Sequence, residues 1–272
     1  MTALTKSAVR IKPKRVTRSS RFGPATVAIA GVLVLWEVTV RIGVLNADYF
    51  PSMFGTLATL FGLAFSGSFW AALGHTLLGA VLGLVIAAIL AIPLGVLIGS
   101  SEWLYRAFRG PIEFLRPMPS VALIPVAVLV LGTGVESKIF LAGFAAFWPL
   151  FVQTIYGMHD TDTLVVETAR SFRIRMRDRL LRIKLPAALP FMATGVRISA
   201  AVSLILAVTA ELLIGAQGLG REINVARAGG AVELMYSLII ASGLLGLAMN
   251  WGMRAGERRL LSWHQSTREG GA

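Results

Sequence analysis

The sequence predicts an all-α membrane protein, a polytopic helical bundle of about six transmembrane helices. Three observations predict this class. Hydrophobic residues make up 56% of the 272 residues, and the mean hydropathy is +0.73. Charged residues make up only 15%, against roughly 25% in soluble chains. Several apolar runs reach the roughly 20 residues that a helix needs to cross a bilayer core of about 30 Å.

Six apolar stretches are the candidate spans. Each is predicted to be helical, because lipid admits only helices and closed barrels and none of the stretches alternates with the period of a barrel strand. The third stretch is the weakest, since it is short and is interrupted by Pro119 and Pro125. The six stretches cover residues 25–45, 71–99, 118–134, 138–157, 187–214 and 234–253.

The first stretch is expected to be a span and not a cleaved signal peptide. Its apolar run is too long for a signal peptide, it lacks a clear small-x-small cleavage site, and five further stretches follow it. We therefore expect one transmembrane domain over residues 25–254. A basic tail, residues 1–24, precedes this domain, and a second tail, residues 255–272, follows it.

The distribution of basic residues predicts the orientation. The net charge is +12, and most Lys and Arg residues lie in the two tails and in the loops 100–117 and 158–185. By the positive-inside rule these parts are cytoplasmic, so we expect both termini inside and a multi-pass protein of the cytoplasmic membrane. Topology and attraction to anionic membrane lipids account for the charge, and no nucleic-acid partner is expected.

The segments between the spans differ in character. Residues 46–70 contain no Lys or Arg, and their apolar part predicts a short helix on the outer interface. Residues 216–232 either form an outer loop or re-enter the bilayer. The loop 158–185 is the longest polar stretch in the body of the chain.

The second stretch carries a small residue at every fourth position. Such a stripe drifts only about 40° per step and lets another helix approach closely, which favours a packing seam over a ligand site. Pro93, within the same stretch, is expected to kink the helix. The small residues are Gly79, Gly83, Ala87, Ala91, Gly95 and Gly99.

The motifs of several enzyme classes are absent from the sequence. There is no phosphate-binding loop of the type G-x-x-x-x-G-K-[ST], no G-x-S-x-G elbow and no H-E-x-x-H pair. The chain has no Cys, and its three His residues are far apart, so neither a disulfide framework nor a metal site is expected. We therefore expect a protein that is not an enzyme and holds no cofactor.

Ionisable residues within spans are few, and each needs a partner or water because burying a charge in lipid is costly. Glu37 and Arg41 are one helical turn apart and are predicted to form a local ion pair. Arg197 and Glu211, in the fifth stretch, are 14 residues apart, about 21 Å along a helix, so they share a face but cannot pair.

That face of the fifth stretch has two open interpretations. In the first, the face lines a polar route through the membrane. In the second, its charged members pair with residues of other helices. The residues of this face are Arg197, Ser203, Thr209 and Glu211.

The loop 158–185 and the residue after it carry a specific motif. It runs Glu167-Thr168-Ala169-Arg170-Ser171-Phe172-Arg173, and after nine further residues Ile183-Lys184-Leu185-Pro186. This resembles the cytoplasmic signature E-A-A-x3-G-x9-I-x-L-P of permease subunits of ATP-binding-cassette importers. The resemblance implies two short coupling helices that insert into a groove of an ATPase subunit.

Two residues depart from the signature of that family. Thr168 replaces its second residue, which is a mild change. Arg173 replaces the usual Gly, so either the turn between the helices is reshaped or Arg173 accepts a positive φ at a cost on the order of 1 kcal/mol.

The resemblance extends over most of residues 50–253 and is nearest to the nitrate, sulfonate and taurine branch. One further departure is Gly79, where many members carry Arg. The matching stretches are Phe50-Pro51-Ser52, Ile92-Pro93-Leu94-Gly95 with Gly99, Arg116-Pro117-Met118-Pro119, Ala122-Leu123-Ile124-Pro125, Leu131-Gly132-x-Gly134 with Ser137-Lys138, Leu189-Pro190, Gly195-Val196-Arg197, Ala210-Glu211 and Gly218-Leu219-Gly220.

The resemblance implies the partners and the cargo. It implies two ATPase subunits that bind ATP and Mg and dock on residues 160–184, and an external solute-binding protein. Since six helices are too few to enclose a translocation path, we also expect a second permease chain, identical to this one. The cargo is then a small anionic or polar solute of the sulfonate, taurine or nitrate type. Two other classes of protein are alternatives: an ion-gradient-driven carrier, which needs an inverted repeat and midplane acids that we do not find, and a scaffold without a pore.

Overall fold

The computed structural model describes residues 22–46 and 48–260. They divide between Phe54 and Gly55 into two units, each described by itself. Most of the predicted tails, 1–24 and 255–272, lies outside the described residues, although the last helix extends to Leu260.

All regular elements in the described ranges are helical, as predicted. The first unit contains α1 (Phe22–Arg41), and α2 (Met53–Leu63) begins where the two units meet. The second unit continues with α3 (Gly67–Ser100), α4 (Glu102–Leu115), a 3-10 turn (Ser120–Leu123), α5 (Ile124–Leu131), α6 (Val135–His159), α7 (Thr163–Ser171), α8 (Met176–Arg179), a π-helical turn (Leu180–Lys184), α9 (Leu185–Ile214), α10 (Leu219–Ala228) and α11 (Val232–Leu260).

Five of the six predicted stretches coincide with the long helices α1, α3, α6, α9 and α11. By length and composition, four helical segments of the described chain are able to cross a membrane: α3, α6, the continuous segment Met176–Ile214 and α11. The chain is therefore a multi-pass membrane protein.

The third predicted stretch, residues 118–134, is not one helix. The predicted loop 100–117 contains the helix α4, and α4 joins the pair formed by the 3-10 turn and α5 at a bend of 80°. This bent pair counts as a fifth span if both arms belong to one crossing. Pro117 and Pro119 explain the break, because proline lacks an N–H group and disfavours helical geometry in the residue before it.

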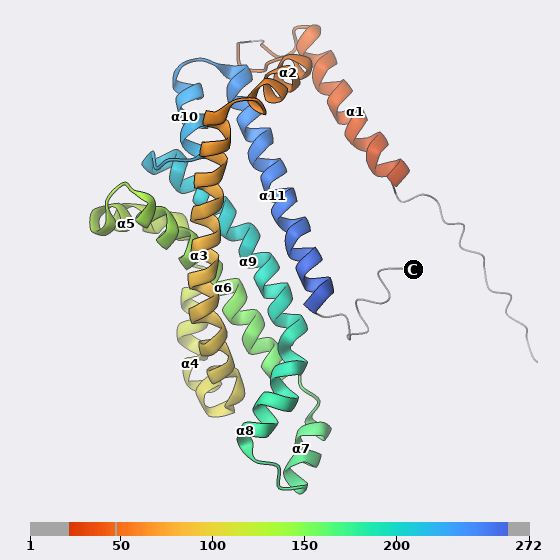
Figure 1. Cartoon of the computed structure of the whole chain (residues 1–272), viewed down its shortest axis with the longest axis vertical. Helices are drawn as coiled ribbons and strands as arrows, with labels where there is room; N and C mark the ends of the chain where they lie inside the picture. The colour runs from red at the N-terminus through yellow and green to blue at the C-terminus, as the bar shows by residue number, and fades with distance from the viewer. Residues whose placement is uncertain (1–21, 47, 261–272) are drawn as a thin grey trace, which may run out of the picture. The chain divides into compact units, whose positions relative to one another are not determined.

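The predicted small-residue seam of α3 is confirmed. Its six small residues are all buried, and α3 packs against α6 along much of its length (Figure 1). A Cβ atom added at Gly83 would lie 2.8 Å from the Cβ of Ala142 and 2.8 Å from the backbone nitrogen of Gly143. The same α6 also packs against α9, so α6 lies at the centre of the helical core.

In the first unit, the predicted ion pair is confirmed. Arg41 Nε lies 2.6 Å from Glu37 Oε1, and the Met53 backbone N–H donates to Glu37 Oε2 at 2.8 Å. Glu37 therefore links α1 to the chain that follows it, in addition to pairing with Arg41.

Residues 216–232, whose structure the sequence left open, contain a short amphipathic helix. Leu219, Ile223 and Ala226 of α10 are buried, and α10 packs against α9 and α11. Within the second unit, α10 lies at the end opposite to α7 and α8 (Figure 1). The predicted short helix in residues 46–70 is confirmed as α2, and Ser237 of α11 donates its hydroxyl to the carbonyl of Thr56 at 2.8 Å.

Candidate functional site

The motif-bearing loop forms two short helical segments separated by a tight turn. Asp162 caps the first segment, α7, by accepting a hydrogen bond from the backbone N–H of Leu164 at 2.8 Å. The second segment runs through α8 and the π-helical turn directly into α9, where Pro186 occupies the first turn, a position that tolerates proline. This matches the two helices that the resemblance implied.

Arg173, two residues after the end of α7, adopts a left-handed conformation with φ of 53°. This is the only positive φ of a non-glycine residue in the described ranges. Its N–H donates to the carbonyl of Arg170 at 2.8 Å, and the N–H of Ile174 donates to the carbonyl of Ala169 at 3.0 Å. These two bonds form a Schellman motif, whose C′ position usually holds glycine. Of the two outcomes that the sequence left open, Arg173 keeps the turn and accepts the strain.

The two helical segments present a mixed surface. Among the motif residues, Ala169 is buried, Ile183 and Leu185 are half-buried, and Glu167, Thr168, Arg170, Ser171, Arg173 and Pro186 are exposed. Three large apolar side chains beside them are also exposed: Leu164 by 68%, Phe172 by 78% and Met176 by 63%. An exposed apolar cluster rimmed by charges is typical of a protein-binding surface.

The residues predicted to line a polar route have partners inside the chain. Arg197 Nη1 lies 3.1 Å from Glu257 Oε2 of α11, and the Ser203 hydroxyl donates to the carbonyl of Ala80 at 2.7 Å. The Thr209 hydroxyl donates to the carbonyl of Ile205, one turn earlier. The expected separation of Arg197 from Glu211 is thus observed, and each of these two charges pairs with a residue of another helix.

Glu211 belongs to a buried polar network that the sequence did not predict. Its carboxylate lies 2.9 Å from Lys138 Nζ, and both side chains are fully buried. The carboxylate also accepts hydrogen bonds from the Thr76 hydroxyl at 2.8 Å and from the Gly220 N–H at 3.0 Å. Lys138 donates to two backbone carbonyls as well, those of His75 and Gln217. The network therefore joins α3, α6, α9 and the chain leading into α10.

Two glycines provide the space for this network. A Cβ atom at Gly79 would lie 2.6 Å from the Cε of Lys138, and a Cβ at Gly218 would overlap the carboxylate of Glu211. At Gly79, where the sequence departs from many members of the family it resembles, the lysine stem thus fills the adjacent space. Lys138 begins the predicted stretch 138–157, and only the polar character of Ser137-Lys138 beside an apolar run hinted at its burial.

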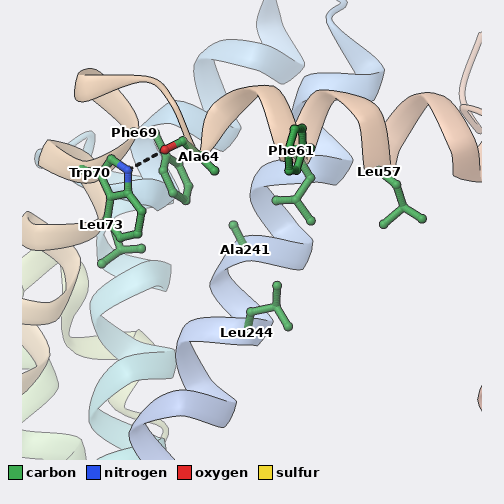
Figure 2. A pocket seen from close by; sticks show the side chains of 9 residues that line it. Leu57, Phe61, Ala64, Phe69, Trp70, Leu73, Ala241 and Leu244 are labelled. Carbon is green, nitrogen blue, oxygen red and sulfur yellow. Dashed lines mark hydrogen bonds between the residues drawn. The ribbon is translucent and has the colours of Figure 1, made fainter. Parts of the chain in front are cut away.

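The second unit also contains an apolar cavity of about 480 Å³ between α2, the start of α3 and α11. Figure 2 shows Phe61, Phe69, Trp70 and Leu244 among the side chains that line it. The indole N–H of Trp70 donates to the carbonyl of Ala64 at 2.9 Å, so this polar group of the cavity lining already has a partner within the chain. With no charged lining residue, this cavity does not suit a small anion.

The fold and the loop together are those of a multi-pass helical membrane protein with a motif-bearing pair of short helical segments at one end. Residues 91–262 match the family described as the binding-protein-dependent transport system inner membrane component, and the chain belongs to this family. Members of this family are permease subunits of ATP-binding-cassette importers, which work with separate ATPase subunits and binding proteins and are not enzymes themselves.

Similar curated proteins fall in the branch that the sequence indicated. The putative aliphatic sulfonates transport permease SsuC of Bacillus subtilis is 30% identical over 95% of this chain and 93% of its own length. The taurine transport permease TauC of Escherichia coli is 28% identical over 87% of this chain and 88% of its own. The nitrate import permease NrtB of Leptolyngbya laminosa is 31% identical over 68% of this chain and 66% of its own length.

The fold is also that of a solved importer. A chain of the MetNI methionine ABC transporter, in an inward-facing conformation, superposes with a TM-score of 0.62. The alignment covers 71% of this chain and 95% of that chain at 18% identity.

Proposed function

We propose that this permease imports a small anion of the sulfonate, taurine or nitrate type. The similarity to SsuC, TauC and NrtB over at least two thirds of the chain supports this class of cargo. In this proposal an external binding protein delivers the anion, and partner ATPase subunits, which bind ATP and Mg, drive its passage.

The coupling residues are assigned to the two helical segments of the loop 158–185 and to Pro186 after it. They are Glu167, Thr168, Ala169, Arg170, Ser171, Arg173, Ile183, Leu185 and Pro186. The single observation that carries this assignment is the exposure of Glu167, Arg170, Phe172 and Met176 together on a short helical hairpin at one end of the bundle. The apolar side chains supply contact area, and the charged ones fix orientation on the ATPase. Nucleotide binding then closes the ATPases and shifts the permease between two access states.

The permease is proposed to work as a homodimer with both termini in the cytoplasm. The spans of a single chain are too few to enclose a translocation path, so a second, identical chain completes it. Arg197, Ser203, Thr209 and Glu211 remain the residues proposed from sequence for that path. Since Arg197 is partly exposed beside Glu257, it is the member of this set most able to attract an anion.

Glu167→Lys tests the coupling assignment. We expect this variant to insert and fold normally but to lose ATP-driven uptake in proteoliposomes, because the reversed charge opposes docking. The matched control is Glu222→Lys, a charge reversal at an exposed position of α10 at the other end of the second unit. Co-purification of the ATPase with Glu222→Lys but not with Glu167→Lys is the expected pattern, and normal uptake by Glu167→Lys would refute the docking assignment.

A further inference from the structure

A second cavity of about 300 Å³ differs from the apolar one in its lining. It lies where the break between α4 and α5 meets α6 and α9. Five of the residues that line it carry polar groups: Arg116, Ser120, Trp148, Gln153 and Tyr156. The apolar remainder comprises Met118, Ala145, Pro149, Val152 and Ile198.

The polar groups of this cavity are mainly hydrogen-bond donors, and no carboxylate lines it. A guanidinium has five N–H donors and no acceptor, and an indole has one N–H donor and no acceptor. The amide of Gln153 and the hydroxyls of Ser120 and Tyr156 can donate as well. A site of this composition favours a ligand that carries negative charge on several acceptor oxygens.

Two of these donors have no acceptor inside the described part of the chain. Trp148 Nε1 is buried from solvent and has no hydrogen-bond partner there. Arg116 is exposed and takes part in none of the ion pairs found among residues 22–46 and 48–260, and the nearby acid Glu113 is already paired with Arg109 at 2.8 Å. A buried donor without a partner, such as Trp148 Nε1, is uncommon in proteins because leaving it unpaired costs stability, whereas the exposed guanidinium of Arg116 is open to water or to a ligand.

The size and place of the cavity restrict its ligand. Its volume is at the lower end of the range found for small-molecule sites, about 300–1,000 Å³, so it suits a solute of few heavy atoms. Arg116 stands at the 80° bend between α4 and the segment that holds α5, and Trp148 precedes Pro149 within α6. The donors therefore come from a helix break and from the central helix of the core.

We propose that this cavity is the subsite of the permease that holds the anionic head group of its cargo, a sulfonate or another small oxyanion. The guanidinium of Arg116 supplies the charge, and Trp148 Nε1 and the amide of Gln153 donate hydrogen bonds to the oxygens. This inference rests on the proposed function, because it names the residues that recognise the solute class assigned there.

Equilibrium binding tests the subsite. The purified permease–ATPase complex, without binding protein, is titrated with labelled taurine, ethanesulfonate and nitrate up to 10 mM, roughly the limit of weak specific binding. We expect at least one of the three to bind, and Arg116→Ala to weaken that binding about tenfold or more, as expected for the loss of a charge-assisted hydrogen bond. The three ligands distinguish an organic sulfonate from an inorganic oxyanion.

Three further variants sharpen the test. Trp148→Phe keeps an aromatic ring and removes only the N–H donor, so we expect severalfold weaker binding. Arg116→Lys retains the charge without the planar fork, and we expect it to bind between wild type and Arg116→Ala. Arg106→Ala is the matched control, since Arg106 is an exposed arginine of α4 that pairs with Glu102 and does not line the cavity, and its affinity should equal that of wild type.

The outcomes separate this inference from the proposed function. Unchanged affinity in both Arg116→Ala and Trp148→Phe overturns the subsite, as does the absence of binding by all three anions to a complex that hydrolyses ATP and supports uptake. If Arg116→Ala does not fold, the anion affinities of Trp148→Phe and Arg116→Lys test the subsite instead, and wild-type affinity in both overturns it. Failure of uptake for every anion in the intact system, with binding protein present, overturns the proposed cargo instead.

Discussion

Replacing Lys138 by methionine is expected to destabilise the permease strongly. Methionine keeps most of the side-chain volume but removes an ammonium group that lies 2.9 Å from Glu211 Oε1 and donates to the carbonyls of His75 and Gln217 at 2.9 and 2.7 Å. Because both side chains are fully buried, the change leaves a carboxylate without its counter-charge and two carbonyls without a donor. Removing one partner of a buried ion pair costs about 3–5 kcal/mol.

The double variant Lys138→Met/Glu211→Gln isolates the interaction between the two charges. Glutamine still accepts hydrogen bonds from the Thr76 hydroxyl and the Gly220 N–H, and it carries no charge that needs a partner. We therefore expect the double variant to be more stable than Lys138→Met, by roughly 2 kcal/mol, as double-mutant cycles of contacting residues allow.

Thermal unfolding of the detergent-solubilised permease measures these effects. A change of 1 kcal/mol shifts the Tm of a domain of this size by about 2–4 °C, so Lys138→Met should lower Tm by roughly 10 °C. The matched control is Arg106→Met, which breaks the exposed ion pair with Glu102 and should cost no more than about 1 kcal/mol. If Lys138→Met shifts Tm no further than Arg106→Met does, the buried network does not stabilise the fold.

Three further predictions concern the helical seam, the loop turn and the proposed path. Gly83→Ala should destabilise the permease by about 1–3 kcal/mol in the same unfolding assay, because its Cβ would meet Ala142, whereas Gly74→Ala, in open space on the same helix, should be neutral or slightly stabilising. Arg173→Gly should leave stability unchanged or raise it by up to about 1 kcal/mol, since the left-handed strain is released; a clear loss would contradict the turn geometry. Arg197→Ala should alter the KM or the rate of anion uptake, and unaltered kinetics would remove Arg197 from the path.

The helices were predictable from sequence wherever one apolar run fills one span. The runs at 71–99, 138–157 and 187–214 became α3, α6 and α9, since lipid forces a continuous apolar chain to satisfy its own backbone hydrogen bonds. The seam of α3 was predictable for a similar reason, because a four-residue spacing of small side chains fixes one face of a helix. The prediction of a single span at 118–134 was wrong, because prolines break the helix and the chain bends between α4 and α5.

The partners of the ionisable groups were not predictable from local sequence. Lys138 and Glu211 are 73 residues apart, and Arg197 and Glu257 are 60 residues apart, so each pair exists only after helices have packed. Local spacing predicted the Glu37–Arg41 pair because both residues lie on one helix. The motif predicted the two helical segments of the loop, but whether Arg173 would accept a left-handed conformation depended on the hydrogen bonds that close the turn.

Site-specific crosslinking in native membrane vesicles tests the central claim most directly, that residues 160–184 bind an ATPase subunit. The chain contains no Cys, so a single Cys can be introduced without further changes. We predict that Phe172→Cys, exposed on the turn after α7, crosslinks to the ATPase, and that Val225→Cys, exposed on α10 at the other end of the second unit, does not. An ATPase that crosslinks to neither position, or equally to both, would contradict the account.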